Sequence, residues 1–321
     1  MAKALTVPAS ENLPATLAPL IEAARDYMAQ ANAPNTSRAY AADWRTFAGW
    51  CESKGLDPMP PSPQVIALYL AAHAGVLKVS TLQRRLSGIV HAARHAGHDV
   101  DTRHPALRDL WRGIKRTHGS APNRKAPTLT PDVLAMLAAL PEGLQGTRDR
   151  ALILTGFAGA FRRSELVALE LRDVAFGLDG VTVTLRRSKT DQEGEGHKVG
   201  LPFGSHGRSC PVLALRGWIE AADITDGRLF RSVNRHGQPG GSLSPYAVAL
   251  IVKRAAERVG LDPATFAGHS LRAGFATSAA RADVSERGIM EQGRWRSLTV
   301  ARGYIREGSL FRDNAAAKIG L

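Results

Sequence analysis

A connection rich in proline and small polar residues, at residues 118–131, most constrains how this chain can fold. It reads HGSAPNRKAPTLTP, contains three prolines, and shows neither a helical nor a strand period. Proline fixes φ and removes a backbone donor, so this stretch is typical of an extended connection. We expect a loose leader over residues 1–12, a first domain over 13–118, a basic linker over 119–128 and a second domain over 129–321.

The two long segments differ in their hydrophobic periodicity. Residues 13–118 are helical in pattern and are broken at turns containing Gly and Pro, which predicts about four or five helices. The second segment is also mainly helical, and RRSELVALELRDV (162–174) is expected to be helical throughout. Its pattern changes to period two in GVTVTLRRSK (180–189) and HKVGLPF (197–203), on either side of a polar turn. The sequence therefore predicts a mainly α protein with a small β-sheet, an all-α domain preceding an α+β domain.

The charge of the chain indicates a polyanionic partner. The 321 residues carry 42 Lys plus Arg against 29 Asp plus Glu, which gives a formal net charge of +13, and 33 of the cations are Arg. A planar guanidinium binds phosphate in a bidentate manner that a lysine ammonium cannot match. The composition therefore favours nucleic acid as the partner, but it indicates no reaction.

Several classes of protein lose support because their motifs are missing. The only cysteines, Cys51 and Cys210, lie far apart, so neither a thiolate zinc site nor a disulfide framework is indicated. No apolar stretch resembles a signal peptide or a membrane span, which predicts a cytoplasmic protein without a membrane partner. Phosphate-loop, dinucleotide-binding, H-E-x-x-H and G-x-S-x-G motifs are absent from the sequence, while a metal-dependent nuclease with scattered carboxylates stays open.

One helix of the first domain carries a basic stripe beside its apolar stripe. The basic stripe contains Arg84, His91 and His95 at helical spacing. Such a face suits a helix that lies along DNA phosphates or in a major groove, although a solvated charged face explains it equally well. Arg124 and Lys125 of the linker are further candidates for DNA contact.

Basic residues at element boundaries of the second domain could carry chemistry. In FRRSEL, Arg162 precedes Glu165 by three positions, close enough for the carboxylate to orient the guanidinium. Lys189 ends a predicted strand at a hairpin turn, and HSLRAG places His269 and Arg272 on one side of a helix start. Each feature alone also has an ordinary explanation, such as a surface ion pair, a solvated lysine or a capping histidine.

Phosphoryl transfer to a tyrosine would use such a set. Two guanidiniums could bind the non-bridging phosphate oxygens and neutralise the charge of the transition state, while a lysine or histidine handles protons. The candidate nucleophile is Tyr304, nine residues after Trp295 in GRWRSLTVARGYI. A free phenol ionises near pH ~10, so Tyr304 would need nearby cations or a general base at neutral pH.

The order of these segments resembles that of the tyrosine recombinases, also called the phage integrase family. GAFRRSELVALELRDV (159–174) resembles the first arginine box and LRRSKT (185–190) the hairpin lysine. GHSLRAG (268–274) is similar to the H-x-x-R box, and GRWRSLTVARGYI (293–305) to the nucleophile segment. The resemblance covers the second domain by motif order, whereas the first domain matches only as a helical bundle of suitable size.

The resemblance implies a site-specific recombinase or integrase that breaks and rejoins DNA. Tyr304 would attack the scissile phosphate and form a 3′-phosphotyrosyl link, which conserves the bond energy and needs no ATP. Arg162 and Arg272 would clamp the phosphate, and Glu165 would support Arg162.

The resemblance also implies roles in proton transfer and positioning. Lys189 would be the general acid for the departing 5′-hydroxyl, with Lys198 as a rival in the same hairpin. His269 would assist proton transfer at the tyrosine. Most relatives have histidine where Trp295 stands, and since an indole N–H only donates, Trp295 would position the phosphate and pack against the nucleophile helix.

The architecture implied by the resemblance is a core-binding (SAM-like) helical bundle and a tyrosine recombinase catalytic domain, closed as a clamp around duplex DNA. The partners are a double-stranded target site and a homotetramer that synapses two sites and proceeds through a Holliday junction. The segment SLFRDNAAAKIGL (309–321) would dock on a neighbouring protomer. No metal, cofactor or nucleotide is implied, and the protein would be associated with the nucleoid. A type IB topoisomerase and a non-catalytic, sequence-specific DNA-binding protein stay open as alternatives.

Overall fold

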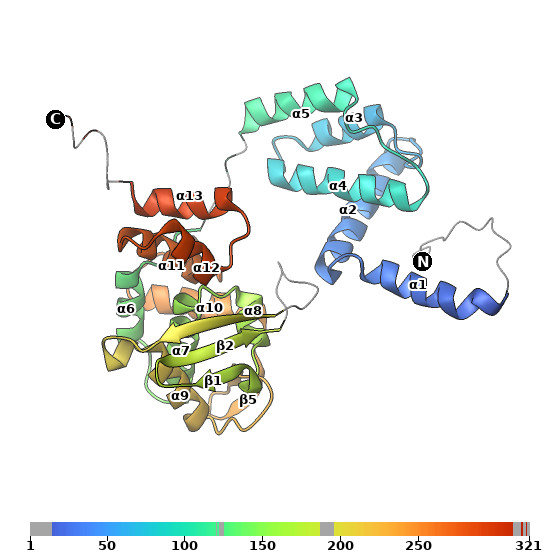
Figure 1. Cartoon of the computed structure of the whole chain (residues 1–321). Coiled ribbons are helices and arrows are strands. Elements are labelled where there is room, and N and C mark those ends of the chain that lie inside the picture. The colour runs from blue at the N-terminus through green and yellow to red at the C-terminus, as the bar shows by residue number, and fades with distance from the viewer. Residues whose placement is uncertain are drawn as a thin grey trace. The chain divides into compact units, whose positions relative to one another are not determined.

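The chain forms two compact units, Met1–Asn123 and Arg124–Leu321 (Figure 1). The structure, a computed structural model, describes residues 15–119, 121, 125–186, 196–310, 316 and 319. Among these described residues, no helix is long and apolar enough to cross a membrane.

The first unit is helical over its described residues. A short 3-10 turn (Ala15–Leu17) leads into five α-helices: α1 (Ala18–Gln30), α2 (Pro34–Ser53), α3 (Pro63–His73), α4 (Val79–His95) and α5 (Pro105–His118). The core lies among α2 to α5 and includes Phe47, Ile66, Tyr69, Leu82 and Ile89, all fully buried. Helices α2 and α4 approach closely at Gly88, where an added Cβ would lie 2.9 Å from the Cβ of Asp43.

The second unit is mainly helical and contains two small sheets. Its helices are α6 (Thr130–Ala138), α7 (Leu144–Ala158), α8 (Arg163–Ala168), α9 (Pro211–Ala221), α10 (Pro245–Arg258), α11 (Ser270–Arg281), α12 (Glu286–Gly293) and α13 (Leu298–Gly308). Its strands are β1 (Val174–Phe176), β2 (Gly180–Leu185), β3 (His197–Pro202), β4 (Arg231–Val233) and β5 (Pro239–Ser242). The prediction of a mainly α protein with a small β-sheet is confirmed.

The three-stranded sheet has the antiparallel order β1-β2-β3, and its central register pairs Val183 with Val199. Side chains of β3 alternate between exposed and buried from Lys198 to Pro202, as a half-buried strand requires. Strands β2 and β3 correspond to the predicted hairpin. Strand β1 and the separate pair β4-β5 were not predicted from the sequence.

The prediction of one helix over 162–174 was wrong beyond residue 168. Backbone pairing to a distant loop ends α8: the N–H of Leu229 donates to the carbonyl of Leu169 (2.9 Å), and the N–H of Leu171 donates to Gly227 (2.9 Å). The chain then makes a 3-10 turn, Leu171–Asp173, and enters β1. Tertiary backbone pairing therefore overrides the helical periodicity of this stretch.

Two separate apolar clusters hold the second unit together. The large one is centred on α7, α9, α10 and the three-stranded sheet and includes the fully buried Trp218 and Phe230. The small one joins α11, α12 and α13, which lie together in Figure 1, and consists of Ala276, Ala279, Ala280 and Ile289 with partly buried aromatic and aliphatic neighbours. Trp295 and Tyr304 belong to this small cluster.

The end of the predicted linker lies along the beginning of α11. The N–H of Ala126 donates to the carbonyl of Thr265 (2.9 Å), and the N–H of Thr128 donates to Ser270 (3.0 Å). Gly274 permits this approach, because a Cβ on residue 274 would lie 1.8 Å from the carbonyl oxygen of Thr128. The helix that carries Arg272 is thus fixed on one side by the segment that enters the unit.

We expect Gly274→Ala to lower the free energy of unfolding by about 1–3 kcal/mol, because the added methyl group must displace backbone rather than a flexible side chain. Urea denaturation followed by circular dichroism measures the change. The matched control is Gly217→Ala in α9, where a Cβ meets nothing within 4 Å and the gain in helix propensity should leave stability equal or higher. Equal stability of Gly274→Ala and Gly217→Ala would contradict the close approach.

Candidate active site

Arg162 and Glu165 are held together at the start of α8. Arg162 is the N-cap residue, and its backbone N–H donates to one carboxylate oxygen of Glu165 (Oε2, 2.9 Å). The Arg162 guanidinium donates to the other oxygen, Oε1. The Glu165 side chain is only 3% exposed. The carboxylate therefore orients this guanidinium, as the spacing in the sequence predicted.

The charges around Glu165 keep it ionised. Burial raises the pKa of the Glu165 carboxyl, but the Arg162 backbone N–H, the charge of Arg294 and the Arg162 guanidinium lower it more. The pKa consequently lies below its ordinary value. The backbone N–H and the two guanidiniums thus together stabilise the ionised form of this buried carboxyl.

Arg272 is buried in the first turns of α11, yet its hydrogen bonding is incomplete. Its Nη1 donates to the carbonyl of Ala160 (2.5 Å), whereas its buried Nη2 has no hydrogen-bond partner among the described residues. Burial, followed by the charges of Arg162 and Arg294, lowers the pKa of Arg272 to about 9. An anion bound beside Nη2 would accept the hydrogen bond that Nη2 does not make and would offset the repulsion between the guanidiniums.

The aromatic residues of the nucleophile segment lie next to Arg272. The Arg272 guanidinium carbon is 4.1 Å from the centre of the Trp295 ring, a stacked cation–π arrangement. The Trp295 and Tyr304 ring centres are 5.9 Å apart, and Tyr304 is half-buried on α13. A negative charge on the Tyr304 oxygen would raise the pKa of Arg272, so the two side chains are within electrostatic range.

The remaining predicted catalytic residues are either exposed or outside the described residues. His269 is exposed and occupies the N-cap position of α11, three residues before Arg272. Lys198 is exposed on β3, opposite Thr184. Lys189 lies outside the described residues. The choice between the two lysines as general acid therefore stays a prediction.

The candidate DNA-binding residues of the first unit are partly engaged within it. Arg84 donates to the buried carboxylate of Asp43 (2.8 Å) while its side chain stays 46% exposed. His91 packs on Tyr40 with ring centres 5.0 Å apart, and burial lowers its pKa, which favours the neutral ring. His95 is exposed and contacts His91 with the two rings tilted and their centres 4.0 Å apart. Their contact with DNA remains a prediction.

The linker candidates Arg124 and Lys125 belong to the second unit. Lys125 is exposed, and its Nζ donates to the carbonyl of Ala264 (2.7 Å). Arg124 lies outside the described residues. Contact of either with DNA stays a prediction.

Sequence reasoning missed a third arginine in this cluster, Arg294. Its side chain is 6% exposed, and its Nη2 donates to Glu165 Oε2 (3.1 Å). Nothing in the spacing of GRWRSLTVARGYI separates Arg294 from the exposed Arg296 and Arg302, since only the turn of the backbone buries it. Among the described residues, no group of three His, Cys, Asp or Glu side chains could hold a metal ion.

The sequence and fold place the chain in a known family. The phage integrase family model matches residues 128–309, more than half of the chain. The integrase/recombinase XerD homolog of Selenomonas ruminantium is 40% identical over 298 residues, which cover 91% of this chain and 87% of that protein. The chain belongs to the phage integrase family, the tyrosine recombinases. Membership confirms the family predicted from the motifs and the class of activity, the breaking and rejoining of DNA strands.

Solved structures share the fold. XerH site-specific recombinase bound to a palindromic difH substrate, in a post-cleavage complex, has a TM-score of 0.66 at 18% identity and covers 88% of this chain and 78% of that one. A lambda integrase tetramer bound to a Holliday junction has a TM-score of 0.58 at 18% identity, with 92% and 78% covered. At this identity the likeness concerns the fold.

Proposed function

We propose that this chain is a site-specific DNA recombinase that uses Tyr304 as its nucleophile. The observation that carries the proposal is the buried Arg272 guanidinium, whose Nη2 lacks a partner among the described residues and whose face stacks on Trp295 beside Tyr304. With Arg162 nearby, the cluster offers a concentration of positive charge that one carboxylate, Glu165, offsets only in part. A phosphodiester supplies the charge and the acceptors that this cluster lacks.

The reaction exchanges one phosphodiester for another. The Tyr304 oxygen forms a bond to phosphorus as the bond to the 5′-oxygen breaks, which leaves a 3′-phosphotyrosyl link and a 5′-hydroxyl. His269 assists removal of the phenolic proton, and Lys189, or Lys198 in its place, protonates the leaving oxygen. Attack by the 5′-hydroxyl of a second strand reverses these steps and releases Tyr304. No nucleotide is consumed, since the energy of the broken bond is kept in the phosphotyrosyl ester.

The two units divide the work of binding and cleavage. Residues 13–118 form the core-binding domain, 119–128 the basic linker and 129–321 the catalytic domain, and the two domains close as a clamp on a double-stranded target site. The net charge of +13 supports this partner, and Arg84, His91, His95, Arg124 and Lys125 contact its backbone or major groove. The Selenomonas relative, which the chain matches over most of its length, supports the assignment of both domains.

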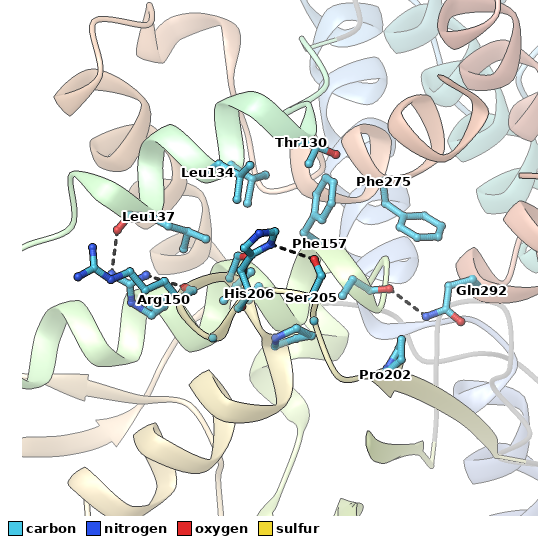
Figure 2. A pocket seen from close by; sticks show the side chains of 18 of the residues that line it. Thr130, Leu134, Leu137, Arg150, Phe157, Pro202, Ser205, His206, Phe275 and Gln292 are labelled. Atoms are coloured by element: carbon cyan, nitrogen blue, oxygen red, sulfur yellow. Dashed lines mark hydrogen bonds between the residues drawn. The ribbon is translucent and has the colours of Figure 1, made fainter. Parts of the chain in front are cut away.

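Assembly into a homotetramer uses an apolar groove on the catalytic unit. The groove measures about 1540 Å³ and lies between α6, α7, β3 and α12, lined by residues such as Leu134, Phe157, Pro202 and Phe275 (Figure 2). Its occupant is segment 309–321 of a second copy, in which Leu310 and Ile319 are exposed. The solved lambda integrase tetramer on a Holliday junction supports this assembly.

A charge placed in the groove should weaken assembly of the tetramer but not the binding of one protomer to DNA. We expect Leu134→Asp, at a side chain that is 48% exposed and lines the groove, to lower recombination at least about tenfold because a carboxylate there must be desolvated. Binding of one protomer to half a site should be unchanged. Native gel shifts resolve these states. The control is Leu213→Asp on α9, which is 46% exposed and does not line the groove; equal loss in both variants would argue against the groove.

Recombination on DNA taken from beside the gene tests the proposed function. The full chain is incubated with supercoiled plasmids that carry two copies of the flanking DNA, and the products are sequenced. Recombinants joined at one position, together with a covalent protein–DNA adduct, are expected. Relaxation without sequence preference or recombinants would identify a topoisomerase, and site binding without any adduct would identify a regulator.

A further inference from the structure

The backbone at Arg294 adopts a conformation that arginine rarely takes. Arg294 ends α12 in the left-handed region (φ 56°, ψ 43°), where the Cβ of an L-residue lies too close to the following carbonyl oxygen. Gly293 before it leaves room for the indole that follows, because a Cβ on residue 293 would lie 1.6 Å from a ring carbon of Trp295. The turn therefore sends the Arg294 side chain inward and folds Trp295 back over the end of α12. A residue held in a strained backbone conformation needs contacts that offset the strain.

Those contacts come from the end of α7 and the loop before α8. The Arg294 guanidinium donates to the carbonyls of Gly159 (3.0 Å) and Ala160 (3.2 Å), and to the carbonyl of Gln292 within its own turn (2.8 Å). Carbonyls at the C-terminus of a helix carry partial negative charge and favour a cation. Gln292, at the edge of the groove in Figure 2, adds a further link, from its Nε2 to the carbonyl of Ala158 (2.9 Å).

The remaining contact reaches the first arginine box. Nη2 of Arg294 donates to Glu165 Oε2, the same oxygen that accepts the backbone N–H of Arg162. The carbonyl of Ala160 is shared too, since it accepts from both Arg272 and Arg294. Ala160 is itself left-handed (φ 45°). Ala160 and Arg294, which both have a positive φ, thus supply the carbonyl and the guanidinium that join the loop before α8 to the end of α12.

We propose that Arg294 is a positioning residue that assembles the phosphate site before DNA binds. It fastens the end of α12 to the Arg162 and Glu165 pair, and the next residue, Trp295, is thereby held over the Arg272 guanidinium at 4.1 Å. This inference rests on the proposed function, since it assigns Arg294 to the alignment of that site and to no contact with DNA. Both terminal nitrogens of its guanidinium are already engaged, by three carbonyls and a carboxylate, and only its buried Nε has no hydrogen-bond partner among the described residues.

The burial of a third cation beside Arg162 and Arg272 indicates that Arg294 aligns the site and does not merely stabilise the fold. Burial lowers the pKa of Arg294 even though Glu165 opposes the shift, so the protein holds a third cation at a cost in a place where two others already repel each other. A residue kept only for packing would be neutral here. The cation instead sets the geometry of the two guanidiniums that meet the phosphate.

The test separates alignment from binding and folding. Arg294→Gly keeps the left-handed turn, which glycine adopts readily, and removes every side-chain contact. On a nicked duplex target at saturating concentration, we expect the rate constant for adduct formation to fall about 10- to 100-fold, because small misplacements of reacting groups have effects of this size. The dissociation constant for the same DNA should change less than about twofold, since no phosphate contact is lost. Arg294→Lys, which keeps the charge but not the fork, should recover part of the rate.

Two results would overturn the inference. One is a wild-type rate at saturating DNA in Arg294→Gly, whatever its affinity. The other applies if Arg294→Gly is unfolded at the assay temperature: a folded Arg294→Met, which lacks every polar contact of the guanidinium, that cleaves at the wild-type rate would then show that these contacts are not needed. Arg287→Ala on the same helix, whose side chain is 87% exposed, controls for the lost charge and should cleave normally. Failure of the proposed function is distinct, because the wild-type chain itself would then form no adduct.

Discussion

Tyr304→Phe is expected to abolish covalent attachment to DNA completely. The substitution removes only the phenolic oxygen, so no nucleophile is left at phosphorus, while the ring keeps its contact with Trp295 at 5.9 Å. DNA affinity and Tm should stay close to those of the wild type, since the loss of one hydroxyl from a half-buried ring costs about 1 kcal/mol or less. Denaturing gels of the chain incubated with a nicked duplex target measure the adduct directly.

The control is the only other tyrosine of the catalytic unit, Tyr246, which is 68% exposed on α10. Tyr246→Phe should form the adduct at the wild-type rate. An adduct that survives in Tyr304→Phe would mean that another side chain attacks the phosphate. Mapping the peptide attached to the DNA would then identify that side chain.

Replacing Arg272 should slow cleavage strongly while the protein stays folded. We expect Arg272→Met to lower the rate of adduct formation about 10²- to 10³-fold, the usual effect of removing one donor from a site that stabilises developing charge. The pKa of Arg272 is lowered to about 9, so the charged form costs stability at any pH below that value, and the cost is lost only as the pH rises through it. At pH 7 a neutral side chain removes this cost but also the hydrogen bond to Ala160 and the stacking on Trp295, so the two effects oppose each other and Tm should stay close to that of the wild type.

Sulfate provides a second measurement on the same variant. Sulfate is a tetrahedral anion that should fill the place beside Arg272 Nη2 and raise the Tm of the wild type more than that of Arg272→Met. Arg287→Met, at an exposed arginine, corrects for the general stabilisation of proteins by sulfate. Equal gains in all three proteins would contradict an anion site at Arg272.

The fold was predictable where local pattern and tertiary structure agree. The period-two stretches became β2 and β3, and the helical periodicity over 13–118 became five helices among the described residues. Strand β1 was missed because its three residues pair with 181–183 of β2, and no local sequence pattern indicates this pairing. The helix expected over 162–174 ended early because Leu169 and Leu171 bond to the loop at 227–229.

The order of the site residues along the chain was predictable, but their burial was not. The spacing of Arg162 and Glu165 on one helix start implied their contact, which the structure contains. The burial of Arg294 was not predictable, because it depends on a left-handed turn that ordinarily calls for glycine and on carbonyls 134 and 135 residues away. Motif order identifies the side chains of a site, whereas the charges that surround them follow only from the packing.

The small size of the cluster around Tyr304 has a consequence for what holds α12 and α13 in place. Its fully or mostly buried members are three alanines and one isoleucine, in contrast to the large aromatic and aliphatic core around α7. Buried apolar area sets much of the free energy that holds an element in place, so the apolar contribution to the attachment of α12 and α13 is smaller than that of the core around α7. The segment that carries the nucleophile is therefore held to the rest of the unit in large part by polar contacts, those of Gln292 and Arg294.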